Sequence, residues 1–386
     1  MPCAFRKHYE RKDSIMKTID GIYTSAKIFT DTIEDYALAQ IRQLCDQKAF
    51  QGSKIRVMPD VHPGKIGTIG FTSTFKDTIL PNVVGVDMGC GITLAKLKQK
   101  QAEFQKLDRV IRDQIPAGTQ IRKKPHALGL TAELNKLRCF RHVQEEKAIL
   151  SIGSLGGGNH FIEIDRDDEG AFYAAIHSGS RRLGQEVTEY YLRAGQKALK
   201  KMGENVPYEL TYLKEQLLED YLHDLEIVQK FAQLNRKAIL DELVKGMKWK
   251  VEWDYSMPHN YAERLKQGGL IRKGAISAKD GETVAIPINM RDGILLGIGR
   301  GNEEWNFSAP HGAGRILKRQ EVGKRFTTAQ FKKEMKGIYC TCMNKDTLDE
   351  APFAYRSLDD ILGMIGETVE IQKILKPVYN FKAGGR

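Results

Sequence analysis

Apolar residues recur every three to four positions in three segments, which is the spacing of an amphipathic helix. The first is Asp31–Asp46, which opens with an aspartate of the type that caps helices. The second and longest is Gln185–Met247, where Leu218 and Leu222 fall on one face. The third predicts a final helix over Asp359–Leu375.

Other segments alternate short apolar runs with glycine clusters, which predicts buried strands that end in tight turns. Two such blocks contain IRVMPDVHPGKIGTIGF with NVVGVDMGCGITLAKL, and AILSIGSLGGGNHFIEI with FYAAIHSGSRRLG. Short apolar runs of the kind that predict strands occur again over Leu270–Gly299. The mixture predicts an α/β or α+β fold with mixed β-sheets, surrounding helices and a cleft at strand ends. There is no regular βαβ rhythm, so a doubly wound sheet is not expected.

A chain of 386 residues suggests two or three domains by length alone. The candidate site residues described below, however, are spread from Asp60 to Lys382. We therefore expect one large domain over residues 1–386, with residues 185–250 as a helical, insertion-like region within it. The segment Gln99–Arg141 is rich in lysine and arginine and is a candidate RNA-facing surface.

Composition narrows the class of protein. Apolar residues make up 41% of the chain, which is too many for a disordered protein, and a net charge of +11 favours an anionic partner such as RNA or nucleotide phosphate. The six cysteines form no disulfide framework, and the opening MPCAFRKHYERKDS lacks the apolar segment of a secretory signal. With no run of about 18 apolar residues to span a bilayer, we expect a cytoplasmic protein with reduced thiols and no membrane partner.

Five of the nine histidines lie in motifs predicted at strand ends, most of them rich in glycine. Any one of them is explained as well by a hydrogen-bonded core or turn residue. Five in the same kind of setting favour a shared site, because loops held by a rigid sheet are where binding residues collect. These histidines are His62, His160, His177, His259 and His311.

The segment VVGVDMGCG places Asp87 and Cys90 three positions apart, in a glycine turn predicted to follow a strand. A thiolate, a carboxylate and neutral imidazoles suit zinc or another transition metal better than magnesium. A buried structural cysteine beside a turn-capping aspartate explains the spacing equally well. The chain has neither a CxxC pair nor HExxH, so neither a zinc ribbon nor a metalloprotease of that type is supported.

Three segments could bind phosphate. SLGGGNH resembles a loop whose backbone N–H groups cradle an anion, although it lacks the Lys-Ser/Thr ending of a P-loop. HSGSRRLG offers Arg181 and Arg182, and RKGA offers Arg272 and Lys273. A glycine turn, a capped helix start and an ordinary basic surface pair are the corresponding structural explanations.

Taken together and in order, these segments resemble the RtcB family of RNA-splicing ligases. The matching sequences are MPDVHPG, GVDMGCG, GSLGGGNHFIE, HSGSR, HNY, RKGA, HGAGR and DEAPFAYR, followed by Lys382 near the C-terminus. The match spans most of the chain from Lys54 onward. Each motif alone is loose, whereas the ordered set is highly specific.

The resemblance implies roles for particular residues. His311 would accept the nucleotide, with Asp60 orienting its ring, and Cys90 would bridge two metal ions, normally manganese. The implied metal ligands are Asp87, Cys90, His160, His177 and His259; the implied contacts to the guanine nucleotide are Asn159, Glu163, Asn260, Tyr355 and Lys382; and the basic residues expected at RNA or phosphate are Arg181, Arg272, Lys273 and Arg315.

The activity implied is a GTP- and Mn²⁺-dependent RNA ligase. It would join a 2′,3′-cyclic phosphate or 3′-phosphate end to a 5′-hydroxyl end, through a guanylated histidine and an RNA-pp-G intermediate, in RNA repair or tRNA splicing. Whether an activating protein takes part is left open by the sequence.

This chain departs from the family pattern in two places. Pro310 stands before HGAGR where a serine is usual, and IPINMRDGILLGIGRG carries Ile288, Asn289 and Arg291 in place of small residues. Two other functions therefore remain as alternatives. One is a dinuclear metallophosphoesterase acting on RNA ends, which needs no nucleophilic histidine. The other is a non-catalytic RNA-binding relative.

Overall fold

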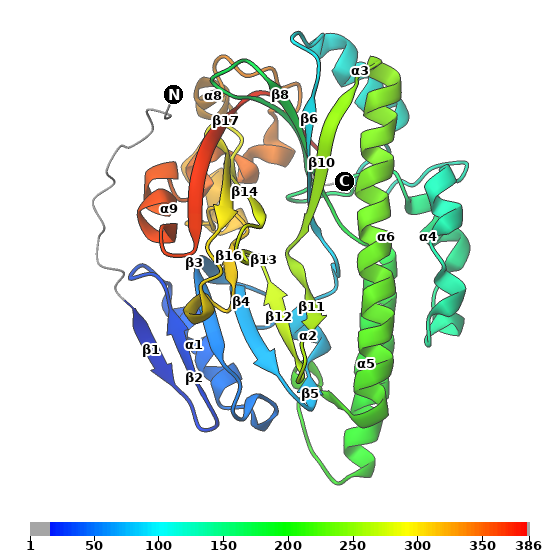
Figure 1. Cartoon of the computed structure of the whole chain (residues 1–386), viewed down its shortest axis with the longest axis vertical. Helices are drawn as coiled ribbons and strands as arrows, with labels where there is room; N and C mark the ends of the chain where they lie inside the picture. The colour runs from blue at the N-terminus through cyan, green and yellow to red at the C-terminus, as the bar shows by residue number, and fades with distance from the viewer. Residues whose placement is uncertain (1–15, 384–386) are drawn as a thin grey trace.

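The computed structural model describes residues 16–383, so the N-terminal segment considered above for a secretory signal lies outside the described residues. Two sheets dominate the described part of the chain (Figure 1). The six-stranded sheet has the order β1-β2-β3-β4-β12-β11, and its strands are β1 Lys17–Asp20, β2 Ser25–Ile28, β3 Ile55–Pro63, β4 Thr68–Phe75, β12 Gly269–Lys273 and β11 Asn260–Arg264.

The seven-stranded sheet has the order β10-β6-β8-β7-β17-β15-β14. Its strands are β10 Val251–Pro258, β6 Gly91–Leu97, β8 Phe172–Ser178, β7 Phe161–Arg166, β17 Val369–Lys382, β15 Gly293–Gly299 and β14 Thr283–Asn289. Two small ribbons pair β13 Ala275–Ser277 with β16 Ser308–Pro310, and β5 Thr78–Ile79 with β9 Leu213–Lys214. Apart from β2 with β3, the pairings are antiparallel, which confirms a mixed α/β fold that is not doubly wound.

Two long helices, α5 (Arg181–Lys201) and α6 (Glu215–Met247), pack against each other, and α6 also contacts β6 and β8 of the seven-stranded sheet (Figure 1). The shorter helices are α1 Asp35–Cys45, α2 Pro81–Val84, α3 Phe104–Gln114, α4 Glu145–Ser151, α7 Arg319–Arg325, α8 Thr328–Glu334 and α9 Leu358–Ile365. None of the helices in the described part has the length and apolar character needed to cross a membrane.

Three sequence predictions of helices needed correction. The first helix begins at Asp35 instead of Asp31, and its N-terminal cap, Glu34, makes no side-chain hydrogen bond. The segment Gln185–Met247 is interrupted between α5 and α6, where Gly203 has a positive φ and Pro207 follows. Both residue types disfavour a continuing helix.

The predicted helix over Asp359–Leu375 was correct only up to Ile365. From Val369 the chain forms β17, which pairs with β15 over its first half and with β7 over its second half. β15 and β7 supply hydrogen-bond partners for the backbone of this segment. The helical spacing of its apolar residues does not reveal them. Tertiary pairing here outweighs the local periodicity.

Helix α6 packs apolar side chains against α5 and against the seven-stranded sheet. It also carries two buried polar residues, Asn235 and Arg236. The Arg236 guanidinium donates to the carbonyl oxygens of Gly89 at 2.7 Å and Ser178 at 2.9 Å. Asn235 accepts from the backbone N–H of Gly153 at 2.8 Å. One turn of α6 thus ties together three loops that are far apart in sequence.

Replacing Arg236 by alanine should lower the free energy of unfolding by about 3 kcal/mol or more, because two buried carbonyl groups lose their donor. Chemical denaturation measures this. Lys237→Ala is the matched control, since Lys237 makes only a partly exposed ion pair with Asp254 at 3.0 Å, and it should cost less than about 1 kcal/mol. Equal losses in the two variants would show that Arg236 does not tie the loops together.

Candidate functional site

The turn that carries Asp87 and Cys90 differs from the prediction in what precedes it. The residues before it form the short helix α2, which starts at Pro81, and the strand β6 begins only after Cys90. The backbone N–H of Cys90 donates to the carbonyl of Asp87 at 3.1 Å, which closes the turn. Both side chains therefore project from the start of a central strand instead of the end of one.

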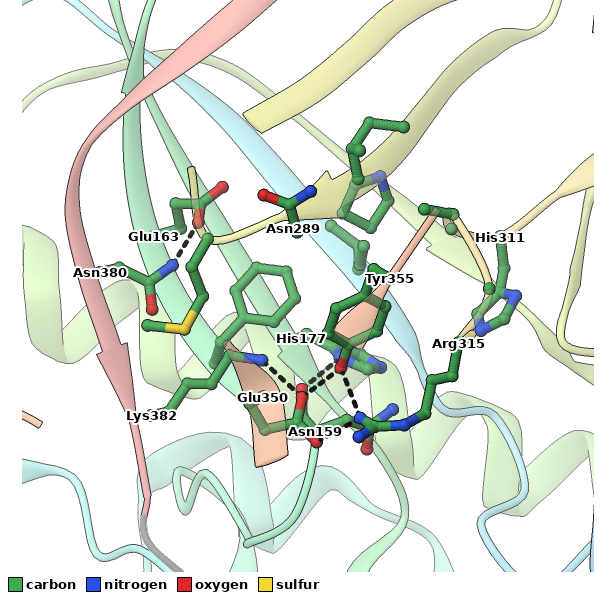
Figure 2. Close-up of a pocket in the computed structure, with 18 of the residues that line it drawn as sticks. Asn159, Glu163, His177, Asn289, His311, Arg315, Glu350, Tyr355, Asn380 and Lys382 are labelled. Carbon is green, nitrogen blue, oxygen red and sulfur yellow. Dashed lines mark hydrogen bonds and ion pairs between the residues drawn. The ribbon is translucent and has the colours of Figure 1, made fainter. Parts of the chain in front are cut away.

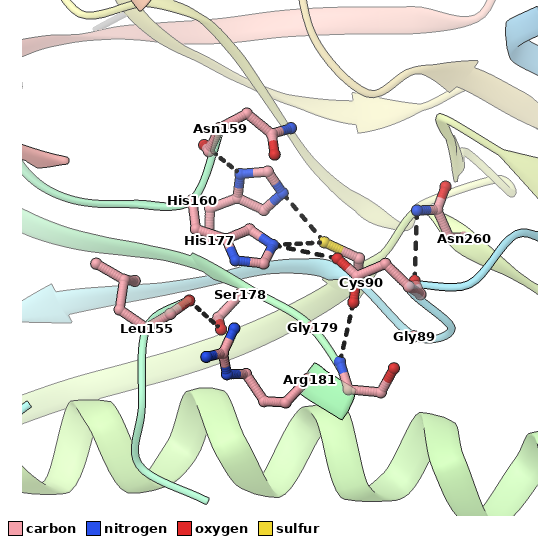
Figure 3. A network of polar contacts seen from close by, with 12 residues as sticks. Gly89, Cys90, Leu155, Asn159, His160, His177, Ser178, Gly179, Arg181 and Asn260 are labelled. Atoms are coloured by element: carbon pink, nitrogen blue, oxygen red, sulfur yellow. Dashed lines mark hydrogen bonds and ion pairs between the residues drawn. The ribbon is translucent and has the colours of Figure 1, made fainter. Parts of the chain in front are cut away.

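Cys90 lies at the centre of a buried cluster of side chains (Figure 3). Its Sγ is 3.4 Å from Nε2 of His160 and 3.3 Å from Nε2 of His177. Asp87 Oδ2 is 3.2 Å from Nε2 of His160, and the Nε2 atoms of His177 and His259 are 3.3 Å apart. The cluster divides into two groups that could each hold a metal ion, Asp87–Cys90–His160 and Cys90–His177–His259, and Cys90 belongs to both.

Asp87 and Cys90 share one turn, and each of the three histidines comes from another part of the framework. His160 precedes β7, His177 lies near the end of β8, and His259 falls between β10 and β11. Gly179 lets the chain after β8 pass close to Asp87, since a Cβ there would lie 2.0 Å from Oδ1 of Asp87. Adjacent antiparallel strands thus bring residues that are far apart in sequence to one point.

The donor chemistry of this cluster fits a metal ion. His177 donates from Nδ1 to the carbonyl of Asn159 at 3.1 Å, which leaves Nε2 as a lone-pair donor toward Cys90. Burial, together with neighbouring imidazoles, holds the pKa of His177 and His259 well below the usual range, so both rings are neutral, as ligands must be. Burial and the charge of Asp87 raise the pKa of the Cys90 thiol, so its thiolate requires a cation. A bound cation would satisfy the thiol and the facing Nε2 atoms together.

His311 lies beside this cluster and directly follows β16. Its Nδ1 donates to Oδ2 of Asp60 at 2.7 Å, and the Asp60 carboxylate is fully buried within β3. The ring of His311 is 4.7 Å, centre to centre, from the ring of His259. Gly314 allows the loop after His311 to pass close to Asp60, because a Cβ there would lie 2.3 Å from the Asp60 carbonyl oxygen. The proton on Nδ1 leaves Nε2 of His311 with a free lone pair.

A pocket with about 760 Å³ of empty space, part of it open to solvent, lies next to His311 (Figure 2). His177, His259 and His311 belong to its lining. The pocket brings together five more residues predicted from the sequence, which are Asn159, Glu163, Arg315, Tyr355 and Lys382.

Four of the residues predicted to contact nucleotide, RNA or phosphate do not line this pocket. Asn260 instead joins two turns, donating to the carbonyl of Asp87 at 3.4 Å and accepting from the N–H of Gly274 at 2.9 Å. Arg181 donates to the hydroxyl of Ser154 and to the carbonyl of Gly118, behind the cluster around Cys90.

Arg272 and Lys273, predicted at RNA or phosphate, are both buried. The Arg272 guanidinium donates to the side chains of Ser308 at 2.8 Å and Glu263 at 2.9 Å. The Lys273 ammonium donates to two backbone carbonyls, and burial lowers its pKa to about 8. In this conformation protein acceptors therefore bind both side chains, and their role at RNA or phosphate stays a prediction.

Sequence reasoning missed Glu350, a buried carboxylate at the same pocket. It accepts from the Tyr355 hydroxyl, from Lys382 Nζ at 2.8 Å and from Arg315 Nη1 at 3.2 Å (Figure 2). Burial alone would raise its pKa, but Lys382, Arg319 and Arg315 hold the pKa of Glu350 well below its usual range. The motif DEAPFAYR contains Glu350, and only Tyr355 was singled out from it.

The segment that departs from the family pattern also reaches the pocket. Pro287, Ile288, Asn289 and Met290 line it, whereas Arg291 forms ion pairs with Asp292 and Glu334. The Asn289 amide donates to Asp292 at 2.8 Å. The unusual side chains are therefore accommodated without filling the space in front of His311.

Fold and site together define a class: an α/β protein with a buried Cys/His/Asp cluster that could hold metal, next to a pocket-facing histidine oriented by an aspartate. Comparison with known proteins gives the family. The family model described as tRNA-splicing ligase RtcB matches residues 40–138 and 131–383, and the chain belongs to the RtcB family.

Curated relatives match along most of their length. RNA-splicing ligase RtcB of Escherichia coli strain K12 is 30% identical over 369 residues, covering 85% of this chain and 90% of the relative. RNA-splicing ligase RtcB1 of another Escherichia coli strain gives the same identity and coverage. The tRNA-splicing ligase RtcB of Thermococcus kodakarensis is 26% identical over 447 residues, covering 92% of each chain.

Cys90→Ala should abolish stoichiometric metal binding, because it removes the one side chain common to both ligand groups. The loss in affinity should exceed the roughly 10–100-fold that follows removal of an outer-shell partner. Metal titration and elemental analysis measure it with Mn²⁺ and Zn²⁺. Cys139→Ala, at a buried cysteine outside the cluster, should keep full metal content; equal content in both variants would exclude this site.

Proposed function

We propose that this protein is a GTP-dependent RNA ligase that joins RNA ends through a guanylated His311. The observation that carries the proposal is the position of the His311 ring, which is hydrogen-bonded to Asp60 at 2.7 Å, lies beside the cluster around Cys90 and lines the pocket. Such a ring presents Nε2 as a nucleophile of fixed direction. The names of the relatives, RNA-splicing and tRNA-splicing ligases, supply the class of substrate.

In the proposed first step, Nε2 of His311 attacks the α-phosphorus of GTP, and pyrophosphate leaves. Asp60 stabilises the positive charge that develops on the ring by accepting from Nδ1–H. The guanylate then passes from His311 to an RNA 3′-phosphate, which water has first released if the end was a 2′,3′-cyclic phosphate. A 5′-hydroxyl finally attacks the activated end, and GMP leaves.

Asp87, Cys90, His160, His177 and His259 would hold two divalent ions, with Cys90 common to both. We propose Mn²⁺ from the family resemblance, since the ligand set itself also admits zinc. Bound ions there would neutralise negative charge on the phosphates of GTP and of the RNA end.

We place the guanine base in the part of the pocket that holds Glu163. A carboxylate can accept from both the N1–H and the N2 amino group of guanine, a pair of donors that adenine lacks. Asn159, Tyr355 and Lys382 are the other proposed nucleotide contacts from the sequence, and Glu350 supports Tyr355 and Lys382 by direct hydrogen bonds.

The proposed partner is RNA with a 3′-phosphate or 2′,3′-cyclic phosphate end and a 5′-hydroxyl end, in repair or tRNA splicing. A dependence on an activating protein stays open, and the cytoplasmic location stays a prediction. A metallophosphoesterase would use the same ligand cluster, but it has no need of a histidine held by a buried carboxylate. A non-catalytic relative would need neither the ligand cluster nor a histidine held in this way.

His311→Ala should lose all labelling by α-labelled GTP in the presence of Mn²⁺, because the label is attached to the ring itself. The measurement is acid-labile radioactivity on the protein, followed by sealing of a nicked RNA hairpin with the proposed ends. His223→Ala is the control, since His223, on α6, is hydrogen-bonded to the Lys136 carbonyl and does not line the pocket. Full labelling of His311→Ala would favour the phosphoesterase; RNA binding by the unaltered protein without labelling or sealing would favour the non-catalytic alternative.

Asp60→Asn should slow guanylation by a factor on the order of 10²–10⁴. The amide is a weaker acceptor, and its N–H₂ can donate to Nδ1, which moves the ring proton to Nε2 and removes the nucleophilic lone pair. Single-turnover labelling with GTP gives the rate. Asp254→Asn, at a partly exposed ion pair, should label at the normal rate, and a normal rate for Asp60→Asn would mean that ring orientation is not set by Asp60.

A further inference from the structure

Two buried carboxyl groups lie next to each other on β7. Glu163 and Asp165 are two residues apart in the strand, so both project from the same face of the sheet. Glu163 is 3% exposed and Asp165 is fully buried. Only Glu163 lines the pocket, so Asp165 lies behind it.

The surroundings of Asp165 are apolar. On that face of the sheet, Tyr173 and Ala175 of β8 stand opposite Asp165 and Glu163, and both belong to a hydrophobic cluster that includes Phe161 of β7, Ile294 of β15 and Leu375 of β17. The hydroxyl of Tyr173 donates to Asp167, not to Asp165. Across the other edge of β7, the residue opposite Asp165 is Pro377 of β17.

Within the described residues, no N–H or hydroxyl donor reaches either carboxyl oxygen of Asp165, and no cation pairs with it. Its interaction is with Glu163, which in turn accepts from the Asn380 amide and feels the charge of Lys382. Two charged carboxylates in contact inside an apolar cluster would repel each other strongly. One proton must therefore be shared by the pair.

The surroundings decide which carboxyl holds this proton. Burial, and then the charge of Glu163, raise the pKa of Asp165 far above its usual range. Burial raises the pKa of Glu163 to about 7, and hydrogen bonds from Asp165 and Asn380 and the charge of Lys382 oppose part of this rise by stabilising the carboxylate. The proton therefore belongs on Asp165.

We propose that Asp165 is a positioning residue for nucleotide specificity, which remains a neutral acid and donates a hydrogen bond to Glu163. This inference rests on the proposed function for the identity of the ligand, a guanine base. Asp165 touches no substrate. Its hydrogen bond favours the carboxylate form of Glu163 and fixes the direction of that group, so that Glu163 can accept from both the N1–H and the N2 amino group of guanine.

The first experiment measures equilibrium binding of GTP and of ITP, which lacks the N2 amino group, to the metal-loaded protein. Asp165→Ala should weaken GTP binding about tenfold or more, since it removes a hydrogen bond to a charged group, and should narrow the preference for GTP over ITP. Binding of tripolyphosphate should not change, because it makes no use of Glu163. A loss of structure alone would weaken all three ligands together.

Asp165→Asn retains a donor of the same shape and should bind GTP within about twofold of the unaltered protein. In Asp165→Ala the pKa of Glu163 should rise further, because its donor is lost, so GTP affinity should recover as the pH is raised. Asp165→Asn should show no such recovery. Comparing the variants at each pH cancels the ionisation of guanine itself.

The second experiment uses no nucleotide, so it separates this inference from the proposed function. The infrared carbonyl band of a protonated, buried carboxylic acid should be present at neutral pH and absent in Asp165→Asn. Asp167→Asn is the matched control, because Lys373 pairs with that carboxylate at 3.0 Å, and it should leave the band in place.

A band that is missing from the unaltered protein, or unchanged GTP affinity in Asp165→Ala, would overturn the role of Asp165. If the unaltered protein shows the band but does not bind GTP, the proposed function fails, and with it the ligand assigned here. The proton shared by Glu163 and Asp165 would then be confirmed, but without a ligand assigned to the pocket.

Discussion

The contact between the Cys90 thiol and two imidazole rings is the interaction on which the site depends. Five side chains that could bind metal gather around it, four of them buried and Asp87 partly exposed, and their facing atoms are mostly acceptors or weak donors. Protein interiors tolerate unmatched polar groups only at a cost of about 1–3 kcal/mol each. A cation bound at this position would be coordinated by these polar groups and would remove the cost of leaving them unmatched. This explains why so many elements of the fold meet here. Arg236, Asn235 and Gly179 hold the backbone of the loops in place with contacts of their own.

The framework also explains how one site can draw on residues from Asp60 to Lys382. The central strands β6, β8 and β7 are neighbours, so the ends of three strands bring Cys90, His177 and His160 to one edge. The second sheet contributes Asp60 from β3 and the start of β11 after His259. His311 directly follows β16, which pairs with β13 in the small ribbon. The proposed nucleophile and the candidate metal ligands thus lie on separate rigid elements, which favours a fixed geometry.

The sequence predicted the mixed α/β fold and the gathering of five histidines, which include His62 at the pocket, because both depend on signals visible in the sequence, namely glycine turns after apolar runs and ordered family motifs. It was less successful where residues far apart in the sequence determine the local structure. Val369–Leu375 has a helical pattern but pairs with two strands, and Arg272 looks like a surface cation but is buried against Ser308 and Glu263. Glu350 was missed because an acid in a phosphate-binding pocket is unexpected until the three cations around it are seen. Spacing cannot show such pairings.

Glu350 and Glu163 show how one pocket can give two buried carboxylates opposite tasks. Three cations surround Glu350, so it stays ionised under all ordinary conditions and serves to hold Lys382, Arg315 and Tyr355 in place. Its charge is already matched by these cations, which leaves little attraction for a ligand. Glu163 feels the charge of one cation, Lys382, and accepts from the Asn380 amide, and on our proposal the acid beside it is neutral, so its charge is available to a base with two donors. Environments that separate the behaviour of like groups are typical of functional sites. The specificity proposed for guanine therefore follows less from Glu163 itself than from the apolar cluster that keeps Asp165 neutral.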